Sequence, residues 1–233
     1  MTSVTVLFEG PQATGKTTTA KYLKELLWKS FGENISMLDI GYENFASKLC
    51  DVILSKMSLM RWYVRSDGFK WRIFLRKEFV VLWLLSHVAG LVPYGIYLAF
   101  IVYIKRPRVL ILERYAFDYL VHMILDSMNW HLTENRRLRI VMSILMRLVY
   151  GLIPRKSLLV LLHCRHKELL LRYTKSGKRK EPLDYVVRQQ LIGHTLLKTV
   201  GAMKSLVIDT TQLKPYEVAK RVFNELLYIK SEG

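Results

Sequence analysis

A phosphate-binding motif lies close to the start of the chain. It consists of eight consecutive residues with the spacing G-x-x-x-x-G-K-T: Gly10, Pro11, Gln12, Ala13, Thr14, Gly15, Lys16 and Thr17. In such a loop the glycines let backbone N–H groups surround an anion, and the following helix adds the positive end of its dipole. The lysine contacts the β- and γ-phosphates, and the threonine hydroxyl binds Mg²⁺. The motif therefore predicts a site for ATP and Mg²⁺ centred on Lys16 and Thr17, with Thr18 at its edge.

The residues on either side have the patterns that a phosphate loop requires. Residues 4–8 are an apolar, β-branched run, which predicts a buried strand. Residues 17–31 place apolar side chains at helical spacing, and Gly32 is a suitable stop. Strand, glycine-rich loop and helix in this order are the structural context in which the motif binds phosphate.

Two acidic residues end predicted strands and so join the candidate site. Glu113 follows the apolar run 109–112, and Asp39 lies at the end of the run 35–40. Because ligands collect at the carboxyl ends of parallel strands, Glu113 is predicted to bind Mg²⁺ directly or through water. Arg114 would hold or position the phosphoryl acceptor. Asp39 is the best-placed general base if that acceptor is a hydroxyl.

A cationic segment at residues 172–183 is predicted to be a mobile lid. It contains five basic residues: Arg172, Lys175, Lys178, Arg179 and Lys180. Phosphoryl transfer depends on positioning and on neutralising the charge of the phosphate oxygens, so a cationic lid suits it. We assign Arg172 to the donor nucleotide, and Lys178 and Arg179 to catalysis. The alternative is a solvated loop that joins two helices.

Coarse patterns predict an α/β fold. Five short apolar runs predict strands: residues 4–8, 35–40, 109–112, 158–163 and 205–208. Helical patterns separate them, which favours repeated βαβ units and a parallel sheet with helices on both faces. The predicted helices are residues 17–31, 45–57, 69–88, 94–104, 115–128, 134–150, 166–173, 183–203 and one from Pro215. No linker-like composition or repeat divides the 233 residues, which predicts a single domain spanning 1–233.

An uncharged apolar segment interrupts this pattern. Residues 79–104 are 26 positions without one Asp, Glu, Lys or Arg. Gly90, Pro93 and Gly95 divide the segment into pieces too short to cross a membrane singly, so we favour a buried helical hairpin or a dimer interface. It would lie in an acceptor-binding region at about residues 42–107. Flanking cations leave open adsorption to an anionic membrane surface. A single transmembrane pass is a third interpretation, but it would separate the phosphate loop from the rest of the sheet.

The composition restricts partners and compartment. The chain has 36 Lys and Arg against 19 Asp and Glu, a formal net charge of +17. Such a charge favours nucleotides, nucleic acid or an anionic membrane as partners. Nucleic acid is disfavoured, because the basic residues accompany apolar segments and no nucleic-acid-reading motif is present. Cys50 and Cys164 have no metal-ligand spacing, which indicates free thiols, and no secretory leader is evident. We expect a cytoplasmic enzyme, with peripheral membrane attachment left open.

The order of these parts resembles the thymidylate kinase family over nearly the whole chain. The matching segments are Phe8-Glu9-Gly10 leading into Gly15-Lys16-Thr17-Thr18, an acid before Arg114-Tyr115, a cationic lid near residue 178, and Val207-Ile208-Asp209-Thr210. The resemblance implies a three-layer P-loop kinase fold, ATP and Mg²⁺ as donor, and a nucleoside monophosphate similar to dTMP as acceptor. By position it assigns roles to Lys16, Thr17 and Arg114, with Lys178 and Arg179 as lid cations.

Departures from that family concentrate on the acceptor side. Gln12 and Glu113 each stand where the family usually has Asp, and Ser86-His87 replaces an Asp-Arg pair on the central helix. A Pro-Arg pair expected after the second strand is absent. Deoxyribonucleoside kinases offer a competing resemblance through their Glu-Arg pair and a lid end similar to Pro182-Leu183-Asp184-Tyr185. A kinase for a lipid-linked acceptor and a non-catalytic nucleotide-binding switch are further alternatives.

Overall fold

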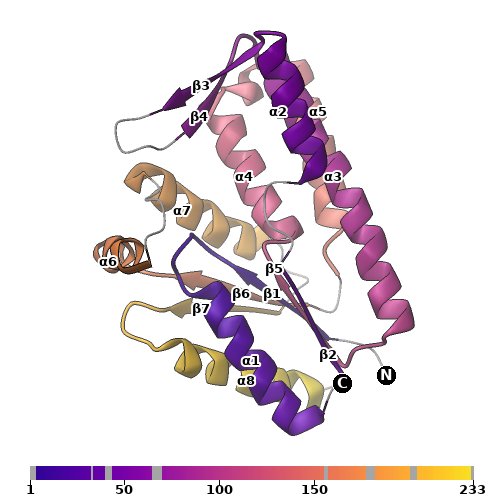
Figure 1. Cartoon of the computed structure of the whole chain (residues 1–233), viewed down its shortest axis with the longest axis vertical. Helices are drawn as coiled ribbons and strands as arrows, with labels where there is room; N and C mark the ends of the chain where they lie inside the picture. The colour runs from indigo at the N-terminus through magenta and orange to yellow at the C-terminus, as the bar shows by residue number, and fades with distance from the viewer. Residues whose placement is uncertain are drawn as a thin grey trace.

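A parallel sheet of five strands forms the centre of the molecule, in the order β2-β5-β1-β6-β7 (Figure 1). The computed structural model describes residues 4–32, 34–39, 44–64, 70–154, 157–176, 182–199 and 204–231. The five strands are β1 (Val4–Glu9), β2 (Ile35–Asp39), β5 (Val109–Glu113), β6 (Ser157–His163) and β7 (Lys204–Asp209). Each neighbouring pair runs parallel. The predicted fold class is confirmed: the chain is α/β with a five-stranded parallel sheet.

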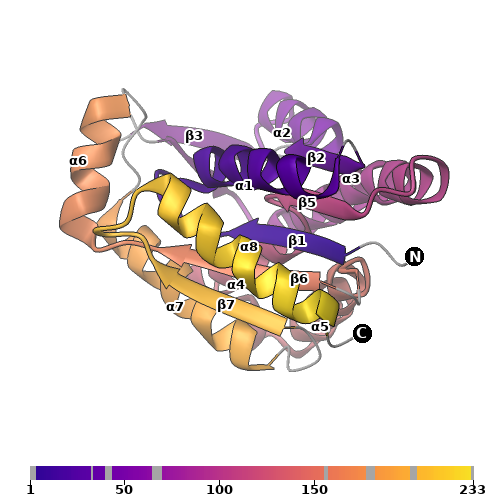
Figure 2. The ribbon, with the colours of Figure 1, turned by 90° about the horizontal axis from the view of Figure 1, so that it is seen from below.

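Helices cover both faces of the sheet (Figure 2). One face carries α1 (Lys16–Phe31) and α8 (Pro215–Ser231), and the other carries α3 (Lys77–Ile104), α4 (Ala116–Asn129), α5 (Arg136–Gly151) and α7 (Leu183–Thr199). Val6 and Phe8 of β1 are buried with α1 and α8, whereas Leu7 is buried with the helices of the second face. Because alternate strand side chains point to opposite faces, both layers hold β1 and position the loop that follows it.

A β-hairpin replaces the start of one predicted helix. β3 (Met60–Val64) and β4 (Lys70–Phe74) pair antiparallel, so the predicted helix 69–88 is wrong in its first part. Met60 and Phe74 face each other across this pair and are both buried. The Arg72 guanidinium reaches back to the Asp51 carboxylate of α2 (Phe45–Lys56) at 2.8 Å. These contacts with distant residues stabilise the strand, and the local apolar spacing does not contain them.

A single helix replaces the predicted pair at residues 69–88 and 94–104. α3 continues from Lys77 to Ile104 through Gly90, Pro93 and Gly95, so the predicted helical hairpin is wrong. Proline removes one backbone hydrogen bond from a helix. Pro93 lies on the exposed side of α3, where water can satisfy the carbonyl that loses its partner. Packing of the opposite side against α2 and α5 holds the helix together across this position.

Gly90 allows α3 to approach the start of α2. A Cβ atom at this position would lie 2.1 Å from Cγ and from Oδ1 of Asn44. Asn44 is buried; its Oδ1 accepts from the Ser47 N–H at 2.9 Å, and its Nδ2 donates to the His87 carbonyl at 3.0 Å. Asn44 therefore caps α2 and joins it to α3.

Substituting Gly90 with alanine is expected to destabilise the protein. The added methyl group would displace Asn44 and break its cap, so we expect a loss of about 2–4 kcal/mol in the free energy of unfolding. Denaturant unfolding measures it. Gly95→Ala is the matched control in the same helix, because its Cβ would be 3.7 Å from the nearest atom, an ordinary contact. If the two variants were equally stable, the role of Asn44 would be refuted.

Candidate functional site

The carboxyl ends of three strands lie together and form the base of the site. Phe8 of β1 pairs with Glu113 of β5, and Asp39 of β2 pairs with Glu113 from the other side. The glycine-rich loop begins two residues after Phe8, so the sheet brings it next to Glu113. The strand order thus joins three parts of the predicted site that are far apart in the sequence.

The loop between β1 and α1 has the backbone conformation that its glycines permit. Gly10 has φ +129°, and a Cβ atom there would lie 2.1 Å from the Leu162 carbonyl oxygen of β6. Gly15 has φ +95° and precedes the first residue of α1. Side chains other than glycine rarely adopt these φ values, so both glycines are required by the turn. The loop therefore presents the N-terminus of α1 to the cavity described below.

Lys16 lies within the curve of the loop. Its Nζ donates to the carbonyl oxygens of Gly10 and of Pro11, the latter at 2.9 Å. The Thr14 hydroxyl donates to the same Pro11 carbonyl at 2.9 Å. The side chain of Lys16 is buried although it is charged. These contacts hold the ammonium group within the glycine-rich loop.

Thr17 and Glu113, the two predicted Mg²⁺ ligands, are in direct contact. The Thr17 hydroxyl donates to Oε2 of Glu113 at 2.7 Å. Glu113 is fully buried, and its Oε1 atom has no hydrogen-bond partner among the described residues. Burial raises the pKa of Glu113, the hydrogen bond from Thr17 lowers it, and the charge of Asp39 raises it. A buried carboxylate oxygen next to a hydroxyl suits a hard divalent cation.

A metal at this position would need ligands from a bound nucleotide as well. Within the described part of the chain, no three His, Cys, Asp or Glu side chains are grouped closely enough to hold a metal ion alone. Mg²⁺ is commonly bound through one or two protein groups together with substrate phosphates. The pair of Thr17 and Glu113 fits that mode.

Three cations meet at a cavity of about 180 Å³ beside the loop. They come from different elements: Lys16 from α1, Arg114 from the end of β5, and Arg172 from α6 (His166–Ser176). The complete lining is Gln12, Ala13, Gly15, Lys16, Thr17, Thr18, Arg114 and Arg172. Arg114 has φ +53°, a conformation that costs energy for a side chain of this kind. The three cations therefore concentrate positive charge in a small cavity, which suits the binding of phosphate groups.

Arg172 links this cavity to the loop that follows β7. Its guanidinium donates to the Thr210 carbonyl at 2.6 Å and to the Glu168 carboxylate at 3.1 Å. The other predicted lid cations, Lys178 and Arg179, lie outside the described residues. The structure therefore brings Arg172 to the cavity beside the glycine-rich loop, and the roles of Arg172, Lys178 and Arg179 stay predictions.

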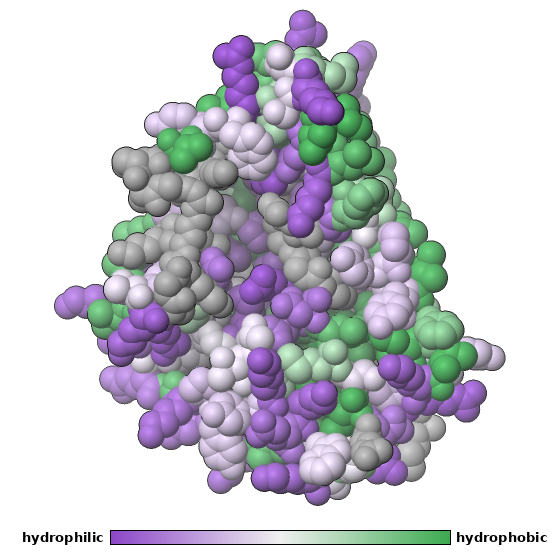
Figure 3. Space-filling view, viewed as in Figure 1, coloured by the Kyte–Doolittle hydropathy of each residue, from purple (hydrophilic) through white to green (hydrophobic). Residues whose placement is uncertain are grey.

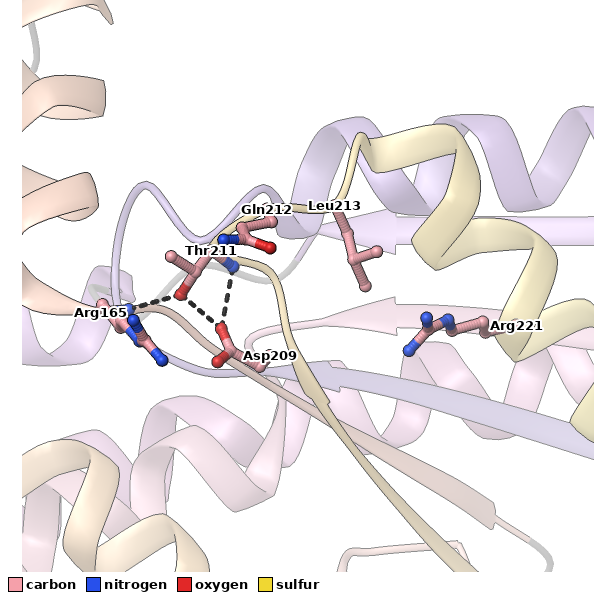
Figure 4. A pocket seen from close by; sticks show the side chains of 6 residues that line it. All are labelled: Arg165, Asp209, Thr211, Gln212, Leu213 and Arg221. Carbon is pink, nitrogen blue, oxygen red and sulfur yellow. Dashed lines mark hydrogen bonds between the residues drawn. The ribbon is translucent and has the colours of Figure 1, made fainter.

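A second cavity, of about 270 Å³, lies beside the loop between β7 and α8 (Figure 4). Its lining comes from the ends of β6 and β7 and from α8: Arg165, Asp209, Thr211, Gln212, Leu213 and Arg221. The Thr211 N–H and hydroxyl both donate to the Asp209 carboxylate, and the Arg165 N–H donates to the Thr211 hydroxyl. The hydrogen bond from Thr211 is the main cause that lowers the pKa of Asp209. These bonds fix the loop that forms the cavity.

Three residues of the predicted acceptor side, Asp39, Ser86 and His87, do not line the cavity beside the glycine-rich loop. Asp39 is exposed at the end of β2 and does not line the cavity beside the loop. His87 is buried, with its ring 4.2 Å from that of Trp83, and the Ser86 hydroxyl donates to the Trp83 carbonyl at 2.6 Å. Ser86 and His87 are therefore used in packing α3. Residues 40–43, where a Pro-Arg pair was expected, lie outside the described residues.

The segment similar to a deoxyribonucleoside kinase lid has a structural role here. The Tyr185 hydroxyl lies 2.6 Å from Nδ1 of His122, which joins α7 to α4. Asp184 accepts from Arg188 at 3.2 Å, and Arg188 also donates to Asn129 of α4 at 2.9 Å. The run therefore attaches α7 to the core helices.

Glu9 lies next to the candidate site and is absent from the residues predicted for that site. It ends β1 directly before Gly10, and it is buried beside Lys16 and Asp118. Burial raises the pKa of Glu9 well above its usual value, the charge of Asp118 raises it further, and the charge of Lys16 lowers it. The rule that identified Glu113 could also have identified Glu9, because each residue is an acid at the end of a strand.

Comparison with known proteins identifies the fold. No protein-family model and no curated protein matches this chain. It superimposes on the thymidylate kinase of Candida albicans with a TM-score of 0.61 at 13% sequence identity, over 100% of this chain and 94% of that one. The thymidylate kinase of Ehrlichia chaffeensis gives a TM-score of 0.54 at 14% identity, over 97% of this chain and 99% of that one. The fold is therefore thymidylate kinase-like.

Proposed function

We propose that this chain is an ATP- and Mg²⁺-dependent kinase that phosphorylates a nucleoside monophosphate similar to dTMP. The observation that carries the proposal is the convergence of Lys16, Arg114 and Arg172 on one cavity beside the contacting pair of Thr17 and Glu113. Phosphoryl transfer needs positioning and neutralisation of phosphate charge, and this set of groups supplies both. The thymidylate kinase-like fold supports the same class of reaction.

Each residue of the donor side is assigned a separate role according to its position. Lys16, held inside the loop, would contact the terminal phosphates of ATP. Thr17 and Glu113 would hold Mg²⁺, which supplies neutralisation of charge on the phosphate oxygens when bound. Arg172 would contact the phosphates from the side of α6, and the donor nucleoside would extend past it towards the cavity of Thr211 and Gln212.

Arg114 is the residue that we assign to the acceptor. Ser86 and His87 are used in packing α3, so neither supplies a cation to an acceptor phosphate. Arg114 follows the end of β5 and lines the cavity together with Lys16. Its guanidinium would neutralise the acceptor phosphate and direct it towards the transferred group.

A screen of acceptors tests the proposed function. ATP consumption would be measured with nucleoside monophosphates, nucleosides and a polyprenol-type alcohol, each in the presence of Mg²⁺. We expect a pyrimidine nucleoside monophosphate to accelerate ADP formation most, and no acceleration with the Arg114→Ala protein. Acceleration by nucleosides or by the polyprenol alone would refute the monophosphate assignment. ATP binding without acceleration by any acceptor would favour a nucleotide-binding switch.

Asp39→Asn distinguishes the classes of acceptor. A phosphate acceptor is already ionised, whereas a hydroxyl must lose a proton during the attack. We therefore expect Asp39→Asn to change kcat by less than about threefold, since removal of a true general base costs about 10²–10⁴-fold. The measurement is kcat with the best acceptor of the screen. A loss of about 100-fold or more would indicate a hydroxyl acceptor.

Arg172→Ala is expected to weaken ATP use without unfolding the protein. The variant removes a cation from the cavity, so kcat/KM for ATP should fall by about 10–100-fold, in the range of a lost charged hydrogen bond. Arg188→Ala is the matched control, because Arg188 is also paired with an acid four residues earlier but does not line the cavity. Equal kinetics of the two variants would contradict the role of Arg172.

A further inference from the structure

The outer side of α3 is apolar along nearly its whole length. Exposed apolar residues recur there every three or four positions: Leu82, Leu85, Ala89, Val92, Ile96, Phe100 and Tyr103. Ile96 is 67% exposed and Tyr103 is 71% exposed. At 1.5 Å per residue, the stripe is about 32 Å long. A helix with one side in the core normally carries polar residues on the other, so this stripe requires an explanation.

Helix α5 carries a second row of exposed apolar residues. It packs beside α3 and exposes Ile140, Ile144 and Leu148 at helical spacing. Figure 3 shows hydrophobic side chains gathered along the side of the molecule where Figure 1 shows α3. We call the exposed sides of α3 and α5 together the α3/α5 face. Rows of exposed apolar side chains of this length mark binding surfaces for proteins or membranes.

The charges around the α3/α5 face are almost all positive. Seven exposed basic residues lie on α5 or directly after α3: Lys105, Arg106, Arg108, Arg136, Arg137, Arg139 and Arg147. Helix α5 contains no acidic residue, and α3 contains only Glu78. On α5, Arg136 and Arg147 share the outward side with Ile140 and Ile144, three to four residues apart. Apolar side chains between cations suit a partner with an apolar interior and anionic groups at its surface, as in an anionic membrane.

The structure leaves only the outer side of α3 free for contact with a partner. Its length and composition would allow it to cross one, but Val80, Leu84, Leu91 and Leu98 are buried in the core of the domain. The helix also connects β4 to β5, so both of its ends are attached to the folded structure. Only the outer side is available to lipid, which corresponds to an orientation in the plane of the interface.

A cavity of about 390 Å³ lies on the flank of α3. It is bordered by small residues of two helices, Gly95 and Ala99 of α3 and Gly151 of α5, and its lining is mainly apolar. Ala99 and Gly151 are exposed, so the cavity is open towards the surrounding medium. An apolar recess beside an apolar stripe can accept part of a lipid chain.

We propose that the α3/α5 face docks on an anionic lipid membrane, with α3 in the plane of the interface. A second copy of the chain is the other occupant to consider. In a two-fold dimer the same surface faces itself, so the basic residues of both copies would be brought together without acids to neutralise them. Anionic headgroups neutralise them instead. The charge pattern therefore favours an anionic membrane over a second copy of the chain.

Vesicle flotation of the full chain tests this proposal. We expect binding to vesicles of phosphatidylcholine and phosphatidylglycerol in equal parts, and weaker binding to phosphatidylcholine alone. Ile96→Ser with Phe100→Ser should reduce binding at least about tenfold. Arg137→Gln with Arg147→Gln should reduce it about 30-fold on the anionic vesicles only. The matched control is Trp28→Ser with Leu191→Ser, which removes two exposed apolar side chains from α1 and α7.

Thermal unfolding of each variant separates lost binding from lost structure. Tyr103→Ser, at a position 71% exposed near the end of α3, provides a milder variant if the double change in α3 unfolds the protein. No binding to anionic vesicles by the folded wild-type chain would overturn the proposal. Equal loss of binding in the Trp28/Leu191 control would also overturn it. A dimer seen by light scattering, dispersed by the α3 variants in the absence of vesicle binding, would assign the face to a second copy.

Discussion

Lys16→Ala is expected to reduce ATP turnover by at least about 100-fold, the lower range for loss of one preorganised group that stabilises charge in the transition state. The Lys16 ammonium is buried in the loop and hydrogen-bonded to the carbonyls of Gly10 and Pro11. In the proposed function it is therefore already held in place before nucleotide binds, and its full charge would act on the phosphates. The measurements are kcat and the affinity for ATP, with the acceptor that the screen identifies.

Two controls make the Lys16 result specific. Lys24→Ala changes an exposed lysine of the same helix, outside the cavity, and should leave kcat unchanged. Far-UV circular dichroism of Lys16→Ala shows whether the loss of its loop contacts has altered the fold. A folded Lys16→Ala protein with wild-type affinity and turnover would refute the kinase assignment as a whole.

Glu113→Gln is expected to have opposite effects on activity and on stability. Turnover should fall at least about 100-fold, because the amide cannot supply the negative charge that a divalent cation requires. The free energy of unfolding without ligand should rise at neutral pH. Burial raises the pKa of Glu113, which means that the ionised carboxylate destabilises the folded state at neutral pH. The glutamine keeps the shape and can still accept the Thr17 hydrogen bond.

The pH dependence of stability tests whether Glu113→Gln stabilises the folded protein. A carboxyl with a raised pKa in the folded state contributes most below its unfolded value of about 4.3, and this contribution is lost as the pH rises through the folded pKa. The Tm of Glu113→Gln should therefore equal that of wild type below about pH 4, and exceed it by an amount that grows as the pH rises through the raised pKa of Glu113 and is constant above that pKa. Glu25→Gln, at an exposed position of α1, should show no such trend. A constant Tm difference across this range would mean that Glu113 is not strained by burial.

Several parts of the molecule follow from local sequence. The glycine spacing from Gly10 to Gly15 and the adjoining strand and helix patterns sufficed to predict the strand, the glycine-rich turn and the helix, because φ freedom and side-chain periodicity are properties of neighbouring residues. The five strands of the parallel sheet were predicted from apolar runs for the same reason. The strand-end rule also placed Glu113 and Arg114 at the correct edge of the sheet. The same rule applies to Glu9, whereas the proximity of Asp118, whose charge raises the pKa of Glu9, comes from the tertiary structure.

Other features depended on contacts between distant residues, and only the tertiary structure decided them. The Gly90, Pro93 and Gly95 signals predicted a break, yet α3 is continuous because its inner side packs on α2 and α5, and Gly90 is needed for contact with Asn44. The β3–β4 hairpin is stabilised by Arg72 reaching Asp51, a pair separated by 21 positions. The contact of Thr17 with Glu113, 96 positions apart, and the arrival of Arg172 at the same cavity likewise come from the order of the strands. Local periodicity determines which segments form helices and strands, whereas burial against distant partners determines where they end and which side chains meet.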